Sequence, residues 1–304
     1  MEHHHHHHAS LAISRKLTIA AIANAVIVIA ELVVGFASGS LSLIGDALHN
    51  LTDAAALVLT LIAVRLERRP ATTAKTYGYQ RAGVLAAFVN SAVLLALTGM
   101  VAKEAIERLR TPHAVETSAM FITAAIAMLI NAATAMSLRR DGRSDVNIRS
   151  AMIHMIGDAV SSAGIIAGAI LIRITGATQW DAIVSLFIGV LILWSSWGVL
   201  KESVNLLLEG TPSGIDTEEV SRAIGAIDGI LGIHHLHIWA LGSSKASLSC
   251  HLMVGDVPVR STSKLLDEVN AMLSHEYGIA HTTIQFEFAN CAENDPYCVP
   301  YTMR

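Results

Sequence analysis

Two stretches, Gly45-Asp46-Ala47-Leu48-His49-Asn50-Leu51-Thr52-Asp53 and His154-Met155-Ile156-Gly157-Asp158, share one pattern inside long apolar runs. Each places a histidine four residues before an aspartate. On a helix, positions i and i+4 lie on the same face, one turn apart. Two such helices that face each other bring two imidazoles and two carboxylates around one point. That is the ligand set of a tetrahedral zinc site.

The composition around these motifs is that of a membrane protein. Of the 304 residues, 53% are hydrophobic and only 15% are charged, whereas soluble domains carry about 25% charged residues. Residues 1–10 include six consecutive histidines, which indicate a purification tag. The net charge of −4 comes with no concentrated basic face, so we expect no nucleic-acid partner. Three cysteines do not make a disulfide framework.

Six apolar runs are each long enough to span a bilayer. They lie near 15–37, 40–65, 80–107, 116–138, 150–173 and 179–207. They predict an all-α, six-helix transmembrane domain over residues 11–209. The N-terminal segment with the second and fourth loops carries eleven Lys or Arg residues, against four around the other loops. The positive-inside rule therefore predicts cytoplasmic N- and C-termini. Short loops and compact size are typical of a bacterial protein, which predicts the cell inner membrane.

The sequence becomes more polar after Glu209-Gly210-Thr211-Pro212, and no later run could cross a bilayer. We expect helices at 216–227 and 261–277, and strands at 234–241, 246–254 and 281–288. The order αββαβ predicts an α+β, ferredoxin-like cytosolic domain over residues 210–290, with both helices on one face of the sheet. Residues 291–304 are expected to be an irregular tail.

Charged side chains inside the apolar runs indicate chemistry, because each costs roughly 2.5–3.5 kcal/mol to place in hydrocarbon. Zn²⁺ accepts imidazole nitrogen and carboxylate oxygen in a tetrahedral cage. Asp46 projects towards the face of His49, either as an acceptor for an imidazole N–H or as a local hydrogen-bonding group. Further polar residues in the spans are Asn24, Glu31, Asn90 and Asp181. The alternative for each is a hydrogen bond to a neighbouring helix and nothing more.

Other stretches complete a pattern with these motifs. They are Ser38-Gly39-Ser40-Leu41-Ser42-Leu43, Tyr77-Gly78-Tyr79-Gln80-Arg81, Leu206-Leu207-Leu208-Glu209-Gly210, His237-Ile238-Trp239-Ala240-Leu241 and Thr283-Ile284-Gln285-Phe286-Glu287. With the paired motifs on the second and fifth of six spans, the chain resembles the cation diffusion facilitator family of zinc transporters. The resemblance covers nearly everything after the tag, and extends to bacterial zinc–cadmium–cobalt resistance members and animal vesicular zinc transporters.

The resemblance implies a homodimer in the lipid bilayer that exports Zn²⁺ from the cytoplasm, with Cd²⁺ and Co²⁺ as further cargo. Carried over, the transport site is His49, Asp53, His154 and Asp158. The family also implies exchange for protons by alternating access. Free histidine titrates near pH 6.5 and holds a proton or a metal but not both. We therefore predict that His49 and His154 carry the proton coupling.

The resemblance also implies that the cytosolic domain binds metal near the dimer interface, as a regulatory ligand. The matching positions are His234, His251 and Glu287, with His281 as a further candidate. His235 and His237 on the same strand are expected not to be ligands. Histidines on a solvated sheet face need no metal, so a purely structural role stays open.

Two pairs outside these sites also fall within the resemblance. Arg81 and Glu209 match an ion pair between the third and sixth spans in the family. Cys291 and Cys298 lie in the tail, where animal members have a metal-binding cysteine pair, and free thiols are the alternative.

Three functions other than transport could also use these residues. An intramembrane metalloenzyme needs an open coordination position and a general base, and the chain has no His-Glu-x-x-His motif, so we expect no enzyme. A passive metal channel would be lined by rings of weak ligands that release ions quickly. A membrane-anchored metal sensor would need no site inside the membrane.

Overall fold

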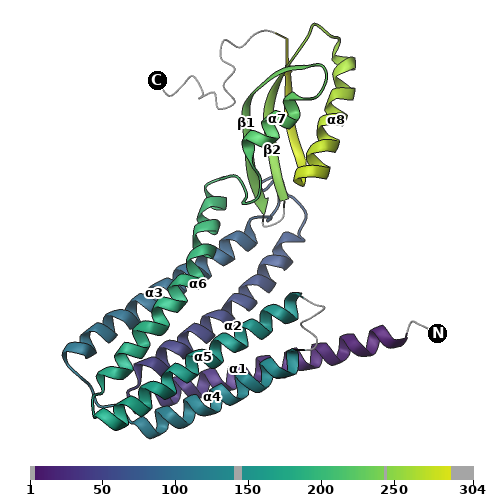
Figure 1. Ribbon diagram of the computed structural model, residues 1–304. Coiled ribbons are helices and arrows are strands. Elements are labelled where there is room, and N and C mark those ends of the chain that lie inside the picture. The colour runs from purple at the N-terminus through teal and green to yellow at the C-terminus, as the bar shows by residue number, and fades with distance from the viewer. Residues whose placement is uncertain (1–3, 140–145, 243–244, 289–304) are drawn as a thin grey trace. The chain divides into compact units, whose positions relative to one another are not determined.

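Six long helices precede a small α+β domain in the computed structural model, which describes residues 4–139, 146–242 and 245–288 (Figure 1). The helices are α1 (His4–Ser38), α2 (Leu41–Glu67), α3 (Ala82–Arg110), α4 (Thr117–Leu138), α5 (Val146–Thr175) and α6 (Gln179–Leu207). Within the described residues, all six are long and apolar enough to cross a membrane. The predicted six-helix architecture is confirmed.

The bounds of the first helix differ from the prediction. The apolar run was expected near 15–37, and the segment suited to a membrane is Ile19–Ser38, but the helical backbone begins at His4. Backbone hydrogen bonding does not require apolar side chains, so a helix can extend beyond its hydrophobic segment.

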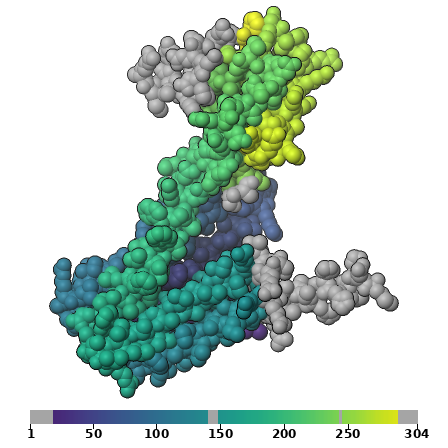
Figure 2. Space-filling view, viewed as in Figure 1, coloured from purple at the N-terminus to yellow at the C-terminus, as the bar shows by residue number. Residues whose placement is uncertain are grey.

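The chain divides into two units, one made of residues up to 58 with 90–198, the other of 59–89 with 199 onwards. In the first unit, α4 lies beside both α5 and α1. The teal surfaces of α4 and α5 form one continuous face (Figure 2). The buried cluster at its centre consists of Leu43, Leu94, Met120, Ala124, Ile165, Ala169, Ile172, Ile188 and Ile192. Large apolar side chains such as Phe36 and Trp194 remain exposed, as expected for surfaces that contact lipid.

The start of α2 is fixed by a carboxylate from α6. Gly39 ends α1 with a positive φ of 71°, a conformation that costs glycine little. Asp181 then accepts hydrogen bonds from the backbone N–H groups of Leu41 and Ser42, at 2.6 and 3.2 Å. It also accepts from the hydroxyls of Ser40 and Ser42, at 2.8 and 2.6 Å. Asp181 thus caps the first turn of α2, where unpaired N–H groups favour a negative charge.

The second unit contains the α+β domain, in the predicted order αββαβ. Its elements are α7 (Thr217–Gly225), β1 (Ile230–Gly242), β2 (Lys245–Val254), α8 (Val259–Tyr277) and β3 (Ile279–Glu287). The sheet order is β1-β2-β3, with β1 antiparallel and β3 parallel to β2. Strand β1 begins four residues before the predicted His234, because residues from Ile230 onwards already pair with the end of β2.

One hydrophobic core joins both helices to the sheet. It includes Val220 and Ile224 of α7 and Val269 and Leu273 of α8, which pack with side chains such as Leu248 of β2. A shared core requires both helices to cover the same sheet face, as predicted. The strands β1 and β2, which carry the candidate histidines, therefore belong to a domain with a hydrophobic core of its own.

Candidate metal centres

The two His-x-x-x-Asp motifs meet in the first unit. Within α2, His49 Nε2 lies 3.8 Å from Asp53 Oδ2, and within α5, His154 Nε2 lies 3.6 Å from Asp158 Oδ2. Across the helices, His154 Nδ1 lies 3.7 Å from Asp53 Oδ2. The two imidazole centroids are 6.4 Å apart. In a tetrahedron with bonds of about 2 Å, neighbouring ligand atoms are about 3.3 Å apart. The spacings bring the four side chains near that separation, but the two contacts of His154 use different ring nitrogens, so one ion would bind only after the ring or a carboxylate turns.

These four side chains differ in access to solvent. Asp158 is only 3% exposed, whereas His49, Asp53 and His154 are 20%, 30% and 36% exposed. Asp158 Oδ2 and His49 Nδ1 are buried and have no hydrogen-bond partner among the described residues. Buried polar atoms without partners are costly, and a bound cation would compensate a carboxylate oxygen of this kind. The donor set fits a divalent metal with mixed nitrogen and oxygen preference.

Two more carboxyl groups lie beside this group, and only one was expected there. Asp46 is 1% exposed and accepts a hydrogen bond of 2.6 Å from the Ser161 hydroxyl, so α2 is tied to α5 here. Its other oxygen has no hydrogen-bond partner, and no hydrogen bond joins it to His49 in the described part of the chain. Glu31 of α1 is fully buried and lies near enough to Asp46 and Asp158 to interact electrostatically with both. Among the residues that the structure describes, neither Glu31 oxygen has a partner that meets hydrogen-bond geometry.

The remaining polar residues of the spans differ in role. Asp181 is held by the amino end of α2, so it acts as a helix cap away from the His-x-x-x-Asp group. Asn50 is fully buried with both amide atoms unpaired among the described residues. Asn50 follows Asp46 by four residues and therefore lies on the same face of α2.

In the second unit, the structure brings together His234, His251 and Glu287. His234 Nε2 lies 3.0 Å from Glu287 Oε2, and His251 Nδ1 lies 2.9 Å from Glu287 Oε1. The pairing of His234 opposite His251 across β1 and β2 accounts for their proximity, since their ring centroids are 5.1 Å apart. His234 is 2% exposed, and its Nδ1 has no hydrogen-bond partner in the described residues.

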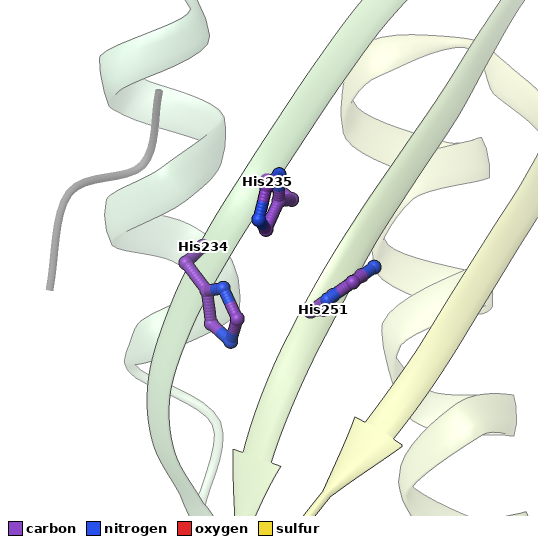
Figure 3. Close-up of side chains that lie close together, drawn as sticks. All are labelled: His234, His235 and His251. Atoms are coloured by element: carbon purple, nitrogen blue, oxygen red, sulfur yellow. The ribbon is translucent and has the colours of Figure 1, made fainter. Parts of the chain in front are cut away.

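His235 joins this cluster, although the sequence led us to expect otherwise. Its ring centroid lies 5.3 Å from that of His234 and 4.8 Å from that of His251 (Figure 3). Potential ligand atoms of all three imidazoles lie within 4.8 Å of one another. Regular strand alternation sends neighbouring residues to opposite faces. Strand β1 has an irregularity here that brings His235 beside His234, and no composition signal announces it.

His281 is not brought to the cluster. It pairs with Ser247 near the start of β3, six residues before Glu287, which is about 20 Å along a strand. Its ring instead contacts Tyr77 edge-on, with centroids 5.5 Å apart. His237 is exposed, and its nearest imidazole neighbour is His235 at 6.5 Å between centroids.

The pKa shifts of His251 and Cys250 have opposite consequences for metal binding. Burial, together with the nearby His235 and His234, lowers the pKa of His251 despite the opposing effect of Glu287. A lowered pKa favours the neutral imidazole that binds metal. Burial raises the pKa of the Cys250 thiol to about 12, so this cysteine stays protonated near neutrality. Cys291 and Cys298 lie outside the described residues.

The expected ion pair between Arg81 and Glu209 is confirmed. Both terminal nitrogens of Arg81 lie 3.4 Å from Glu209 Oε1. Arg81 also donates to the carbonyl of Ala240, at 3.3 Å. The guanidinium therefore links the loop before α3, the segment after α6 and strand β1 within the second unit.

The chain also matches two known domain families. Residues 17–208 match the cation efflux transmembrane domain, and residues 212–289 match the cation efflux protein cytoplasmic domain. The chain belongs to the cation efflux family. This family is the cation diffusion facilitator family that the sequence resembled, and membership with six candidate spans makes the chain a multi-pass membrane protein.

Relatives in the cation efflux family match along nearly their whole length. The metal cation efflux system protein CzcD of Cupriavidus metallidurans is 40% identical over 92% of this chain and 89% of its own. The zinc transporter ZitB of Escherichia coli is 40% identical over 91% of this chain and 88% of its own. The cadmium, cobalt and zinc/H(+)-K(+) antiporter of Bacillus subtilis is 37% identical over 90% of this chain and 88% of its own.

Proposed function

We propose that this protein exports Zn²⁺ from the cytoplasm in exchange for protons, with Cd²⁺ and Co²⁺ as further cargo. The transport site is His49, Asp53, His154 and Asp158. The observation that carries the proposal is the convergence of the two motifs from α2 and α5, at 3.6–3.8 Å between imidazole nitrogens and carboxylate oxygens. The names of the relatives, which cite zinc, cadmium, cobalt and H(+)-K(+) antiport, support this cargo and a driving force that includes protons.

Proton coupling follows from competition at the imidazoles. His154 presents one nitrogen to Asp53 and the other to Asp158, so a protonated ring has a carboxylate on each side. A metal ion must displace that proton to bind the nitrogen. Alternating access would then expose the site to metal on one side of the membrane and to protons on the other.

The wider assignment rests on the same family membership. The protein acts as a homodimer in the cell inner membrane, with both termini cytoplasmic. Residues 11–209 form the transport domain, and residues 210–290 form a cytosolic domain that binds Zn²⁺ through His234, His251 and Glu287 as a regulatory ligand. The protein is not an enzyme. The two imidazoles and two carboxylates of the membrane site fill a tetrahedron and leave no position for a reacting water.

The decisive experiment is Zn²⁺ uptake into inside-out proteoliposomes, with and without an imposed proton gradient. The intact protein is compared with Asp158→Ala and with Glu107→Gln, a control that removes an exposed carboxylate whose ion pair, in the part of the chain that the structure describes, is with Lys103. We expect gradient-driven uptake for the intact protein and the control, and none for Asp158→Ala. Uptake that ignores the gradient would indicate a channel. Metal binding without any uptake would indicate a sensor.

A second experiment tests which groups couple protons to metal. His49→Asp and His154→Asp keep four metal ligands but replace an imidazole with a carboxyl group, which as a free side chain is the stronger acid. We expect the pH dependence of Zn²⁺ uptake to move towards lower pH in both variants. An unchanged pH profile would show that the histidines do not carry the coupling.

A further inference from the structure

We infer that His235 is a third imidazole ligand of the cytosolic metal site, and that one protomer supplies a complete four-ligand set of His234, His235, His251 and Glu287. This inference rests on the proposed metal binding by the cytosolic domain and goes beyond it. Nothing in the sequence indicated a ligand at this position, and its proposed role depends on the local shape of β1.

A β-bulge turns His235 towards the cluster. His234 pairs with His251, and His237 pairs with Ser249. Strand β1 thus advances three residues where β2 advances two, so His235 and Leu236 together oppose Cys250. Bulges re-aim side chains and often lie next to functional sites. Here the bulge allows two neighbouring histidines to face the same space, with His251 on the adjacent strand (Figure 3).

The backbone at His235 lies in a region that side chains rarely adopt. Its φ is +51°, and Glu209 is the only other non-glycine residue with positive φ in the part of the chain described. Residues are held in such conformations only when the surrounding structure requires it. Strand pairing on both sides of the bulge holds His235 in this conformation. The conformation places a third imidazole beside His234 and His251.

The distances suit a tetrahedral metal. Potential ligand atoms of the three imidazoles lie within 4.8 Å of one another, and a zinc tetrahedron needs about 3.3 Å between ligands. Side-chain rotations would close the difference. Glu287 already touches two of the imidazoles at 3.0 and 2.9 Å. The unpaired, buried Nδ1 of His234 is a further donor that a metal would satisfy. Three nitrogens and one oxygen favour Zn²⁺ or Co²⁺ over Mg²⁺ or Ca²⁺.

The test uses Co²⁺ binding to the full chain without its six-histidine segment, His3–His8, which would itself bind metal. The variant His49→Ala/Asp158→Ala removes two ligands of the membrane site and serves as the background. Into it we introduce His235→Asn, which keeps a residue that tolerates positive φ but lacks the imidazole. His237→Asn is the matched control, because His237 lies on the same strand outside the cluster.

We expect the background to bind one Co²⁺ per chain with the intense visible absorption of a tetrahedral site. His235→Asn should weaken binding about tenfold or more, the loss that even an outer-sphere partner produces, and should weaken that absorption. His237→Asn should match the background. Equal affinity and equal spectra for the two asparagine variants would overturn the ligand role of His235. A background protein that binds no Co²⁺ would instead overturn the proposed cytosolic site itself, whereas Zn²⁺ transport by the unsubstituted chain would be unaffected by either result.

Discussion

At the scale of single residues, Glu31 is the group whose surroundings the sequence indicated least. The sequence showed only a glutamate in the first apolar run. In the structure Glu31 is fully buried beside Asp46 and Asp158, and neither of its oxygens has a partner among the described residues that meets hydrogen-bond geometry. Desolvation of such a group opposes folding, so its presence is explained better by function than by stability.

We therefore expect Glu31→Gln to reduce transport without weakening the fold. Zn²⁺ uptake in proteoliposomes should fall by about tenfold or more, as for the loss of groups that support metal ligands. The unfolding temperature in detergent should stay the same or rise, because a neutral amide is less costly to bury than a carboxylate. A fall in unfolding temperature with normal uptake by the folded fraction would assign Glu31 a structural role instead.

At the scale of elements, α2 carries His49 and Asp53 of the first motif and is anchored at its first turn. Asp181 of α6 accepts two backbone and two side-chain hydrogen bonds there, and it is 1% exposed. The sequence placed Asp181 among candidate chemical residues. Its geometry is that of a helix cap supplied by another helix, which no local motif could reveal.

Loss of this cap should destabilise the first unit, in which Asp181 of α6 meets the start of α2. We expect Asp181→Ala to lower the free energy of unfolding by about 2 kcal/mol or more, since it leaves buried N–H groups unpaired. Asp181→Asn keeps one acceptor oxygen and should cost less. Thermal unfolding in detergent measures both. Equal stability of the alanine variant and the intact protein would refute the capping role.

The ion pair of Arg81 with Glu209 belongs to the same scale. The two side chains are 35% and 68% exposed, so the pair should add no more than about 1 kcal/mol to stability. We expect Arg81→Glu and Glu209→Arg each to slow Zn²⁺ uptake, and the double swap to recover part of it. Recovery is partial because a glutamate cannot donate to the Ala240 carbonyl. No recovery in the double variant would show that the two charges act independently.

At the scale of the whole molecule, the six long helices and the α+β domain have separate buried clusters. Metal bound at the proposed cluster would join β1, β2 and β3, because His234, His251 and Glu287 come from these three strands. Ligands that bind only the folded state stabilise it by mass action. The sheet should therefore be the part of the molecule that responds to metal removal.

Chelation is expected to loosen this sheet locally. Zn²⁺ at one hundred times its Kd should add about 2.7 kcal/mol to the stability of the domain, and EDTA should remove it. Hydrogen exchange of peptides covering β1 and β2, in protein without the tag, reports the change. The metal effect should disappear in His251→Ala and persist in His275→Ala, an exposed histidine of α8. Equal responses in the two variants would contradict the assignment.

The sequence by itself determined the six spans, the order αββαβ and the spacing within each His-x-x-x-Asp motif. These features depend on local hydrophobicity and on the helical repeat, which a linear sequence records directly. It also indicated that His234 and His251 belong together, although through resemblance and not through register.

Only the tertiary structure decided which distant groups meet. It placed Glu31 beside Asp46 and Asp158, set Asp181 on the first turn of α2, and left His281 against Tyr77. It also turned His235 into the histidine cluster through a bulge and a positive φ. Contacts between helices and irregularities of strand pairing depend on packing across the whole chain. For that reason, periodicity along one segment could not predict them.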